Sequence, residues 1–247
     1  MAARVVPETQ ASKPLGGGYV SFLDSDDFIA PVYIERLVNA LENCNADFAA
    51  CPFQNVHEAD FERKPDYDKG DKEFSTDVLA QQYLHRKICL IAPALLVKRE
   101  ILDSIFFDED CPYDEDGLFV WSLLYNSRRG VYCNSPMYNY RVREGSVMHS
   151  LTAEKCHQSI QCYVKQCNEF AQKRDDEVTE QILPNYKLAS QHVLAKNVNY
   201  EEFKKEYDRT ERKDIKKLIK ISDIKLALLA IVYITSPRLF YMTCKRM

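Results

Sequence analysis

The sequence lacks the features that mark several special classes of protein. Its nine cysteines include no Cys-x-x-Cys pair, and Cys156, Cys162 and Cys167 have helix spacing rather than that of a zinc site. No uninterrupted apolar run reaches about 18 residues, the length that a spanning helix needs. The first residues also lack the apolar segment of a signal peptide. We therefore expect buried thiols, a reducing cytoplasmic compartment and no spanning helix.

A strong net charge is also missing, but the charge is unevenly distributed. The formal net charge of −4 argues against a general nucleic-acid-binding protein. Residues 212–247 hold nine Lys and Arg against two Asp and Glu, so this segment carries +7 and the remainder −11. Because the segment also contains the apolar run 224–234, it predicts peripheral attachment to an anionic membrane surface. The alternative is an ordinary helix that packs on the rest of the protein.

Three carboxylates directly follow a short, mostly apolar stretch, Tyr19-Val-Ser-Phe-Leu, which is rich in β-forming residues. They are Asp24, Asp26 and Asp27. A strand that ends in carboxylates can hold Mg²⁺ or Mn²⁺, because these hard cations take oxygen ligands and are usually bound by one or two carboxylates plus substrate phosphates. The alternative is a strand followed by an acidic turn or a helix start, where Asp is common.

A second acidic cluster, Asp114-Glu115-Asp116, precedes a helix that we expect to end near Gly130. The helix dipole stabilises negative charge at this position. A carboxylate kept ionised there can act as a general base toward a hydroxyl group. The alternative is a plain helix cap.

Composition and periodicity predict three regions. Residues 1–18 read as an irregular lead-in, 19–150 as an α/β part, and 151–247 as a helical region with a basic tail. Two prolines punctuate this pattern. We expect the short strand that includes Pro52 to lie near a sheet edge, and we expect Pro184 to break a helix.

Three motifs, in the same order and with similar spacing, resemble those of bacterial family 2 glycosyltransferases, which have the GT-A fold. Tyr19–Leu37 (YVSFLDSDDFIAPVYIERL) is similar to the family's signature, in which Asp-x-Asp binds the divalent cation. Phe107–Leu124 (FDEDCPYDEDGLFVWSLL) looks like the Glu-Asp motif and the helix after it. Tyr138–Arg141 with Arg143–Ser146 looks like the Tyr-x-Tyr-Arg and Gly-Ser segment.

This resemblance implies a fold and a function. The fold would be an α/β, GT-A-like (Rossmann-like) mixed sheet that lacks part of its N-terminal half, followed by a helical C-terminal region. The function would be transfer of a sugar from a nucleotide-sugar donor to a glycan or lipid-linked acceptor in polysaccharide biosynthesis, on the cytoplasmic face of the membrane.

The resemblance also implies roles for the two acidic clusters. Asp24 and Asp26, with Asp27 beside them, would hold Mg²⁺ or Mn²⁺ against the donor diphosphate. Asp116 would deprotonate the acceptor hydroxyl in an inverting displacement, and Glu115 would help to position the acceptor or the base.

Four further contacts are expected. Ser25 would join Asp24 in binding the donor, and Arg141 and Arg143 would meet phosphate charge, because guanidinium matches phosphate geometry. His149 lies where some GT-A enzymes bring a late histidine to the metal. The arginines also fit solvated strand-end charges, and a lone histidine fits a structural role.

The sequence departs from the family's pattern before residue 18. Family members begin with a strand–helix–strand half that builds the nucleotide-base pocket, and residues 1–18 leave no room for it. We therefore expect a chain that is truncated at its N-terminus. Two alternatives to catalysis by sugar transfer stay open: an inactive remnant that acts as a binding or assembly partner, and a phosphotransferase with an aspartyl nucleophile.

Overall fold

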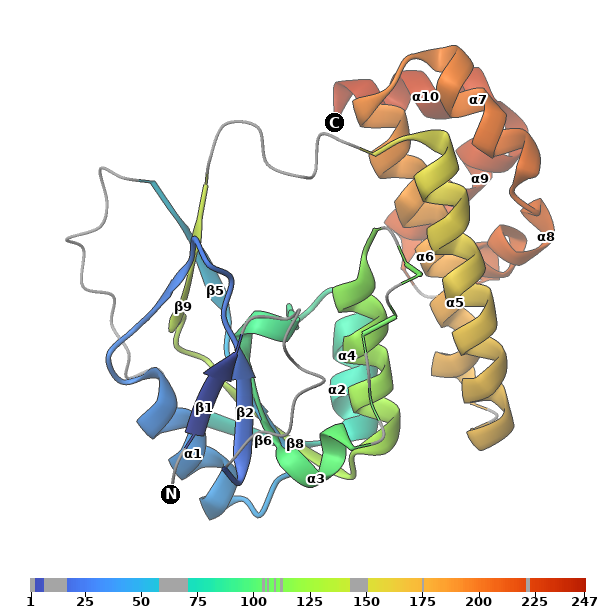
Figure 1. Cartoon of the computed structure of the whole chain (residues 1–247). Helices are drawn as coiled ribbons and strands as arrows, with labels where there is room; N and C mark the ends of the chain where they lie inside the picture. The colour runs from blue at the N-terminus through green and yellow to red at the C-terminus, as the bar shows by residue number, and fades with distance from the viewer. Residues whose placement is uncertain are drawn as a thin grey trace. The chain divides into compact units, whose positions relative to one another are not determined.

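The chain folds into two compact units, seen here in a computed structural model (Figure 1). The structure describes residues 3–6, 17–57, 71–103, 105, 107–108, 110–111, 113–142, 151–174, 176–220 and 223–247. The α/β unit comprises Met1–Phe107 and Asp116–Glu144. The helical unit comprises Asp108–Glu115 and Gly145–Met247. Its first segment, Asp108–Glu115, was predicted to belong to the α/β part.

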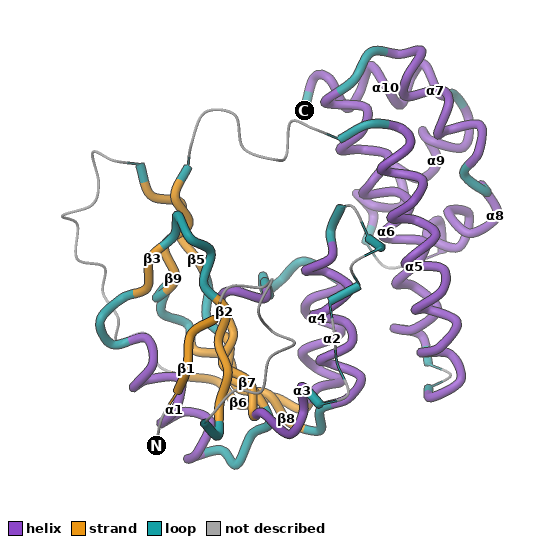
Figure 2. Tube along the Cα trace, in the orientation of Figure 1, coloured by secondary structure: helices purple, strands orange, loops and turns teal. Residues whose placement is uncertain are grey.

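A mixed sheet of six described strands forms the centre of the α/β unit (Figure 2). In spatial order its strands are β1 (Ala3–Val6), β2 (Tyr19–Phe22), β7 (Leu95–Lys98), β4 (Phe48–Ala50), β8 (Arg129–Cys133) and β6 (Asp71–Ser75). The pairs β1–β2 and β4–β8 are parallel, and the other three pairs are antiparallel. Leu95, Leu96 and Val97 of β7 are completely buried because both sheet faces are covered.

A smaller sheet carries the residues next to the first acidic cluster. Its central strand, β9 (Tyr138–Arg141), pairs antiparallel with β3 (Phe28–Ile29) and parallel with β5 (Phe53–Val56). Asn139 fixes this sheet from inside: its Oδ1 accepts a hydrogen bond from Gln54 Nε2 at 2.6 Å, and its Nδ2 donates to the Phe28 carbonyl at 3.2 Å.

Helices cover both faces of the large sheet, with α1 on one side and α2 and α4 on the other (Figure 1). The helical segments of this unit are α1 (Tyr33–Asn43), α2 (Thr76–Leu84), the 3₁₀ turn η3 (Ala92–Ala94), α3 (Arg99–Leu102) and α4 (Glu115–Asn126). On α1, Tyr33, Leu37 and Leu41 recur every four residues and are fully buried. They form one apolar cluster with residues from β4, β7 and β8, which fixes α1 on its side of the sheet.

The helical unit confirms the helical C-terminal region that the sequence predicts. Its helices are α5 (Ala153–Lys173), α6 (Glu177–Asn197), α7 (Tyr200–Arg209), α8 (Arg212–Ile215), the 3₁₀ turn η5 (Lys216–Lys220), α9 (Ile224–Thr235) and α10 (Pro237–Arg246). Side chains at Thr152, Asp176, Asn199, Asp223 and Ser236 cap five of them through hydrogen bonds to backbone N–H groups. Among the described helices, none is both long and apolar enough to cross a membrane.

Several local predictions were wrong, each because long-range packing outweighed a local preference. The strand β1 lies within the predicted irregular lead-in, where Val5 and Val6 suit a strand beside β2. The strand β4 lies between β7 and β8 rather than near an edge, and Pro52 separates it from β5. Gly130 lies in β8 and not at a helix end. Pro184 lies inside α6, which continues through it because its apolar face, including Pro184, is buried.

Candidate functional site

The strand β2 and the helix α1 are fastened together just before the first acidic cluster. Ser21 Oγ donates to the Leu95 carbonyl at 2.6 Å and lies 3.0 Å from the Tyr33 hydroxyl. Tyr33, which is fully buried, donates in turn to the carbonyls of Pro93 and Leu95 at 3.1 and 3.2 Å. Every polar atom in this group has a partner, so the network holds β2 rigidly and fixes where its carboxyl end points.

The chain then turns sharply through the three predicted metal ligands. The Asp27 N–H donates to the Asp24 carbonyl at 3.1 Å, which closes a turn over Asp24–Asp27. Asp24 and Asp26 are half-buried, whereas Ser25, at the middle of the turn, is exposed. The three carboxylates therefore lie on one short turn directly after β2.

Asp27 connects this turn to the small sheet. Its Oδ2 accepts a hydrogen bond from the Tyr138 hydroxyl at 2.7 Å, and its Oδ1 accepts one from the Arg141 N–H at 2.8 Å. Both carboxylate oxygens are thus engaged with β9, so Asp27 fits a role in shaping the turn better than a role as a metal ligand. Sequence reasoning missed this contact, although the Tyr-x-Tyr-Arg motif had drawn attention to β9.

The negative charge of the turn affects two tyrosines of β9. Burial, the hydrogen bond to Asp27 and the charge of Asp24 raise the pKa of Tyr138, which keeps its hydroxyl protonated as a donor. Burial and the charges of Asp27, Asp26 and Asp24 also raise the pKa of Tyr140. The three carboxylates therefore concentrate negative charge on the side of the turn that faces β9.

The carboxylates of the turn supply some, but not all, of the oxygen ligands that Mg²⁺ or Mn²⁺ requires. Within the described ranges, no group of three or more His, Cys, Asp or Glu side chains is arranged to hold a metal ion. Asp24 and Asp26 supply hard oxygen atoms on one turn, and two carboxylates with substrate phosphates are a common arrangement for Mg²⁺. These two residues fit a cation that completes its coordination with a bound diphosphate.

The second acidic cluster begins α4. Asp114 has a positive φ of 63°, a conformation that Asp tolerates better than most residues, and directly precedes Glu115, the first residue of the helix. In the helical unit its Oδ2 accepts a hydrogen bond from the Tyr163 hydroxyl at 2.5 Å. Tyr163 belongs to α5, and no pattern in the sequence indicated this contact. Asp116, in the first turn of α4, is half-buried.

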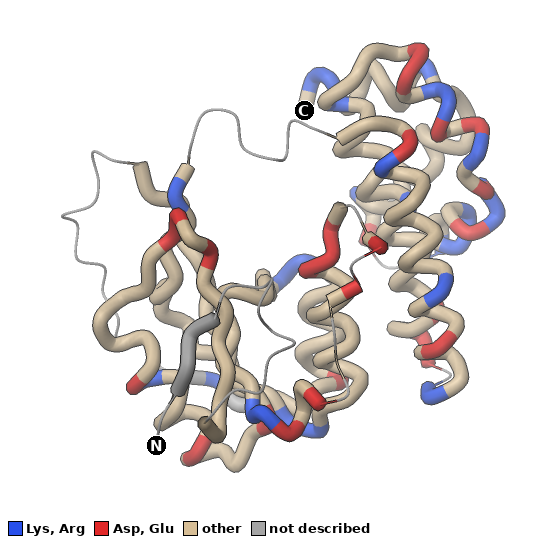
Figure 3. Tube along the Cα trace, in the orientation of Figure 1, with Lys and Arg blue, Asp and Glu red and all other residues tan. Residues whose placement is uncertain are grey.

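Within the α/β unit, aromatic side chains pack β2, which precedes the first acidic cluster, against α4, which begins in the second. The rings of Phe22, at the end of β2, and Phe119, in α4, meet edge to face with centroids 5.4 Å apart. Phe107 packs against both rings. Asp24 follows Phe22 by two residues, and Asp116 precedes Phe119 by three. Figure 3 shows the two acidic segments, one where β2 ends and one where α4 begins.

The other predicted site residues have different outcomes. Arg141 ends β9 opposite Val56, and its backbone, as noted, holds Asp27. Arg143 and His149 lie outside the residues that the structure describes. Their predicted roles, and those of Ser25 and Glu115, stay predictions.

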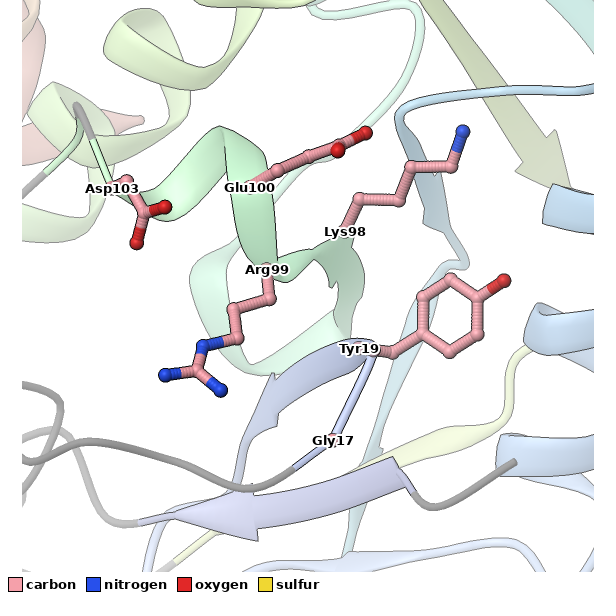
Figure 4. A pocket seen from close by; sticks show the side chains of 7 residues that line it. Gly17, Tyr19, Lys98, Arg99, Glu100 and Asp103 are labelled. Atoms are coloured by element: carbon pink, nitrogen blue, oxygen red, sulfur yellow. The ribbon is translucent and has the colours of Figure 1, made fainter.

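A cavity of about 380 Å³ lies at the other end of β2, away from the acidic turn (Figure 4). Its lining includes Tyr19, which begins β2, and Lys98 and Arg99 at the junction of β7 and α3. The side chains of Tyr19 and Lys98 extend to one side and that of Arg99 to the other (Figure 4). Because Asp24 follows the opposite end of β2, we do not include this cavity in the candidate site.

Comparisons with known proteins agree with the fold. Residues 10–106 match the family model described as glycosyl transferase family 2. Glycosyltransferase GlyA of Streptococcus pneumoniae is 27% identical over 151 residues, which are 58% of this chain and 22% of that protein. The minor teichoic acid biosynthesis protein GgaB of Bacillus subtilis is 27% identical over 143 residues, or 56% of this chain and 15% of that protein. The chain thus spans less than a quarter of either relative.

A solved structure extends the similarity to nearly the whole chain. The crystal structure of residues 1–349 of S. aureus TarS, in complex with UDP-GlcNAc, covers 97% of this chain and 69% of its own, with a TM-score of 0.64 and 15% identity. At this identity the likeness concerns the fold. It confirms the mixed α/β, GT-A-like architecture with a helical C-terminal region.

Proposed function

We propose, from the match of residues 10–106 to the family model described as glycosyl transferase family 2, that the chain transfers a sugar from a nucleotide-sugar donor to a hydroxyl group of a glycan or lipid-linked acceptor. The names of GlyA and GgaB support a role in polysaccharide or teichoic acid synthesis. The UDP-GlcNAc bound by TarS, which shares the fold, supports a uridine diphosphate sugar as the donor to be tested first.

The observation that carries the proposal is the packing of Phe22 on Phe119. Because of this contact, the end of β2, which the carboxylates Asp24 and Asp26 follow, packs against α4, whose first turn carries Asp116. Sugar transfer requires two functions of this kind: one that manages the charge of a diphosphate and one that accepts a proton from a hydroxyl group.

We assign Asp24 and Asp26 to a divalent cation, Mg²⁺ or Mn²⁺, which when bound would neutralise the negative charge of the departing diphosphate. Asp27 holds the turn in shape through Tyr138 and Arg141. Ser25 and the Arg141 side chain are proposed donor contacts.

Asp116 is the proposed general base. It takes the proton of the acceptor hydroxyl as that oxygen forms a bond to the anomeric carbon, while the bond from this carbon to the diphosphate oxygen breaks. Attack opposite the leaving group inverts the anomeric configuration. Glu115 is the proposed aid to positioning. We also propose that the reaction takes place in the cytoplasm, where the nine free cysteines, most of them buried, would stay reduced.

Titration calorimetry of the full chain with UDP, with and without Mn²⁺, tests the proposal. We expect metal-dependent binding of UDP that Asp24→Asn and Asp26→Asn each weaken by about 10-fold or more, since each loses a charged oxygen ligand. Asp116→Asn should retain the UDP affinity but slow the turnover of UDP-GlcNAc by about 10²–10⁴-fold, as expected for loss of a general base.

The matched control is Asp103→Asn, which removes an exposed carboxylate of the same unit at the other end of β2. It should change neither binding nor turnover. Absence of UDP binding with and without metal would reject the proposal and favour a non-catalytic binding or assembly partner. Hydrolysis of a generic phosphate ester that is lost in Asp24→Asn would instead favour a phosphotransferase.

A further inference from the structure

The helix α9 exposes an apolar face where a helix on the surface of a globular protein normally has polar residues. Ile224, Leu228 and Ile231 recur at intervals of four and three residues and are 73%, 57% and 38% exposed. The opposite side of α9 is already packed: Ala230 and Tyr233 are fully buried. The exposed face is therefore additional to the one that holds α9 in the fold.

The next helix, α10, has the same character and packs against α9. Phe240 is buried and meets the ring of Tyr233 edge to face, with centroids 5.0 Å apart. Leu239 and Met242, three residues apart on α10, are each about half exposed. We call Ile224, Leu228, Ile231, Leu239 and Met242 the apolar α9–α10 face.

The charges around this face are mostly positive, and Asp223, the exposed N-cap residue of α9, is an acidic exception beside Ile224. Residues 224–247 contain four basic residues, Lys225, Arg238, Lys245 and Arg246, and no Asp or Glu. All four are exposed, and the preceding turn η5 adds three exposed lysines, Lys216, Lys217 and Lys220. Figure 3 shows the basic residues along the last helix.

From this combination we propose that the apolar α9–α10 face docks onto a membrane surface that carries anionic lipids. Aliphatic and thioether side chains surrounded by Lys and Arg are the composition of an interfacial helix, whose apolar face enters the headgroup region while its cations meet lipid phosphates.

Two features disfavour a protein partner. The face has no exposed aromatic residue of the kind that anchors most protein interfaces. A symmetric dimer through this face would bring the same basic residues against each other, because a two-fold interface uses the same patch on both copies. An anionic lipid surface satisfies both the apolar side chains and the cations.

Co-sedimentation of the full chain with vesicles tests the proposal, and it needs no sugar donor, so its result is independent of the proposed transfer reaction. We expect binding to vesicles of phosphatidylcholine mixed with phosphatidylglycerol, and little binding to phosphatidylcholine alone. Added salt should weaken the binding, because it screens the attraction between the exposed cations and the lipid phosphates.

Substitutions separate the two contributions. Leu228→Ser and Ile231→Ser should each weaken vesicle binding by about 10-fold, because each removes an aliphatic side chain from the lipid contact. Val78→Ser is the matched control, since Val78 in the α/β unit is 38% exposed, as is Ile231. Lys225→Gln and Arg246→Gln should each weaken binding by about five-fold, whereas Lys72→Gln and Lys87→Gln, exposed lysines of the α/β unit, should not.

Unchanged thermal unfolding would show that the variants fold. The proposal is overturned if the chain binds neither kind of vesicle, if it binds both equally, or if Leu228→Ser and Ile231→Ser bind as the unchanged chain does. A dimer in sedimentation velocity that these two substitutions dissociate, without vesicle binding, would instead identify the face as a contact between copies.

Discussion

The Tyr138 hydroxyl donates a hydrogen bond to Asp27 Oδ2 at 2.7 Å and so joins the acidic turn after β2 to a strand 111 residues further along the chain. The raised pKa of Tyr138 keeps this donor protonated. The contact explains why the third carboxylate of the turn faces β9.

Replacing Tyr138 by Phe removes this bond together with the contact between the hydroxyl and the Asp24 backbone. We expect Tyr138→Phe to lower the free energy of unfolding by about 1.5–3 kcal/mol, the range for a hydrogen bond to a charged group. Urea denaturation measures this loss. UDP affinity should fall as well, because Asp27 then keeps only its bond from the Arg141 N–H and holds the turn less firmly. Tyr140→Phe on the same strand is the control and should stay within about 0.5 kcal/mol; an equal loss in both variants would contradict the role given to Tyr138.

Gly130 is required by close packing. A Cβ atom at this position would lie 2.5 Å from both Leu79 Cδ1 and Phe48 Cζ, and both of these side chains are fully buried. We expect Gly130→Ala to lower the free energy of unfolding by about 1–3 kcal/mol, because the core has to shift to admit a methyl group. Gly18→Ala, where nothing lies within 4 Å of the new atom, should be close to neutral in the same thermal or urea unfolding experiment.

The helical unit contains a nearly buried ion pair, Lys187 Nζ with Asp214 Oδ2 at 2.6 Å. We expect Lys187→Met to lower the free energy of unfolding by about 3–5 kcal/mol, because Asp214 would keep its charge without its partner. Adding Asp214→Leu should restore much of the loss. The exposed pair Lys204–Asp208 provides the comparison, and Lys204→Met should leave the urea midpoint unchanged.

Glu206 gives stability a predictable dependence on pH. It is fully buried, and burial raises its pKa in spite of His157 and Thr210, which lie beside it. The folded state therefore holds a proton that the unfolded state has released. Stability is greatest below the ordinary value of 4.5 and falls as the pH rises from there through the folded-state pKa.

Two substitutions test this predicted fall of stability with rising pH. Glu206→Gln should gain stability relative to the unchanged chain as the pH rises above 4.5, because it has no proton to lose. Arg209 lowers the pKa of Glu154, so the unchanged chain should lose stability relative to Glu154→Gln as the pH falls below 4.5. Urea midpoints measured from below to above pH 4.5 follow both variants, and the same pH response in the two would refute the assignment.

Local patterns sufficed to predict the features that depend on local physics. The β-forming run from Tyr19 predicted β2, and the periodicity of residues 151–247 predicted the helical region. Asp24 was predicted to follow a strand, as it does, and the cluster Asp114-Glu115-Asp116 was predicted to precede a helix, which in the structure begins within it, at Glu115. Periods of two and 3.6 residues carry this information directly.

The remaining features depend on contacts between distant residues, which no local pattern contains. Pro52 indicated a sheet edge, but the pairing of β4 with both β7 and β8 decided otherwise. The orientation of Asp27 could not be predicted because its partners lie more than 100 residues away. Asp114 was read with a plain helix cap as the alternative to a functional role, whereas its contact with Tyr163 assigns it to the helical unit.

The pairing of β3 with β9 also has a consequence for how the chain acquires its site. Closing a loop of more than 100 residues costs more conformational entropy than closing a local turn, so we expect this contact to form late in folding. A peptide of residues 19–32 contains every carboxylate of the turn but not the strand that shapes it. We expect such a peptide to bind Mn²⁺ no better than an unstructured acidic peptide, and we expect the cation site to arise only once synthesis has passed Arg141.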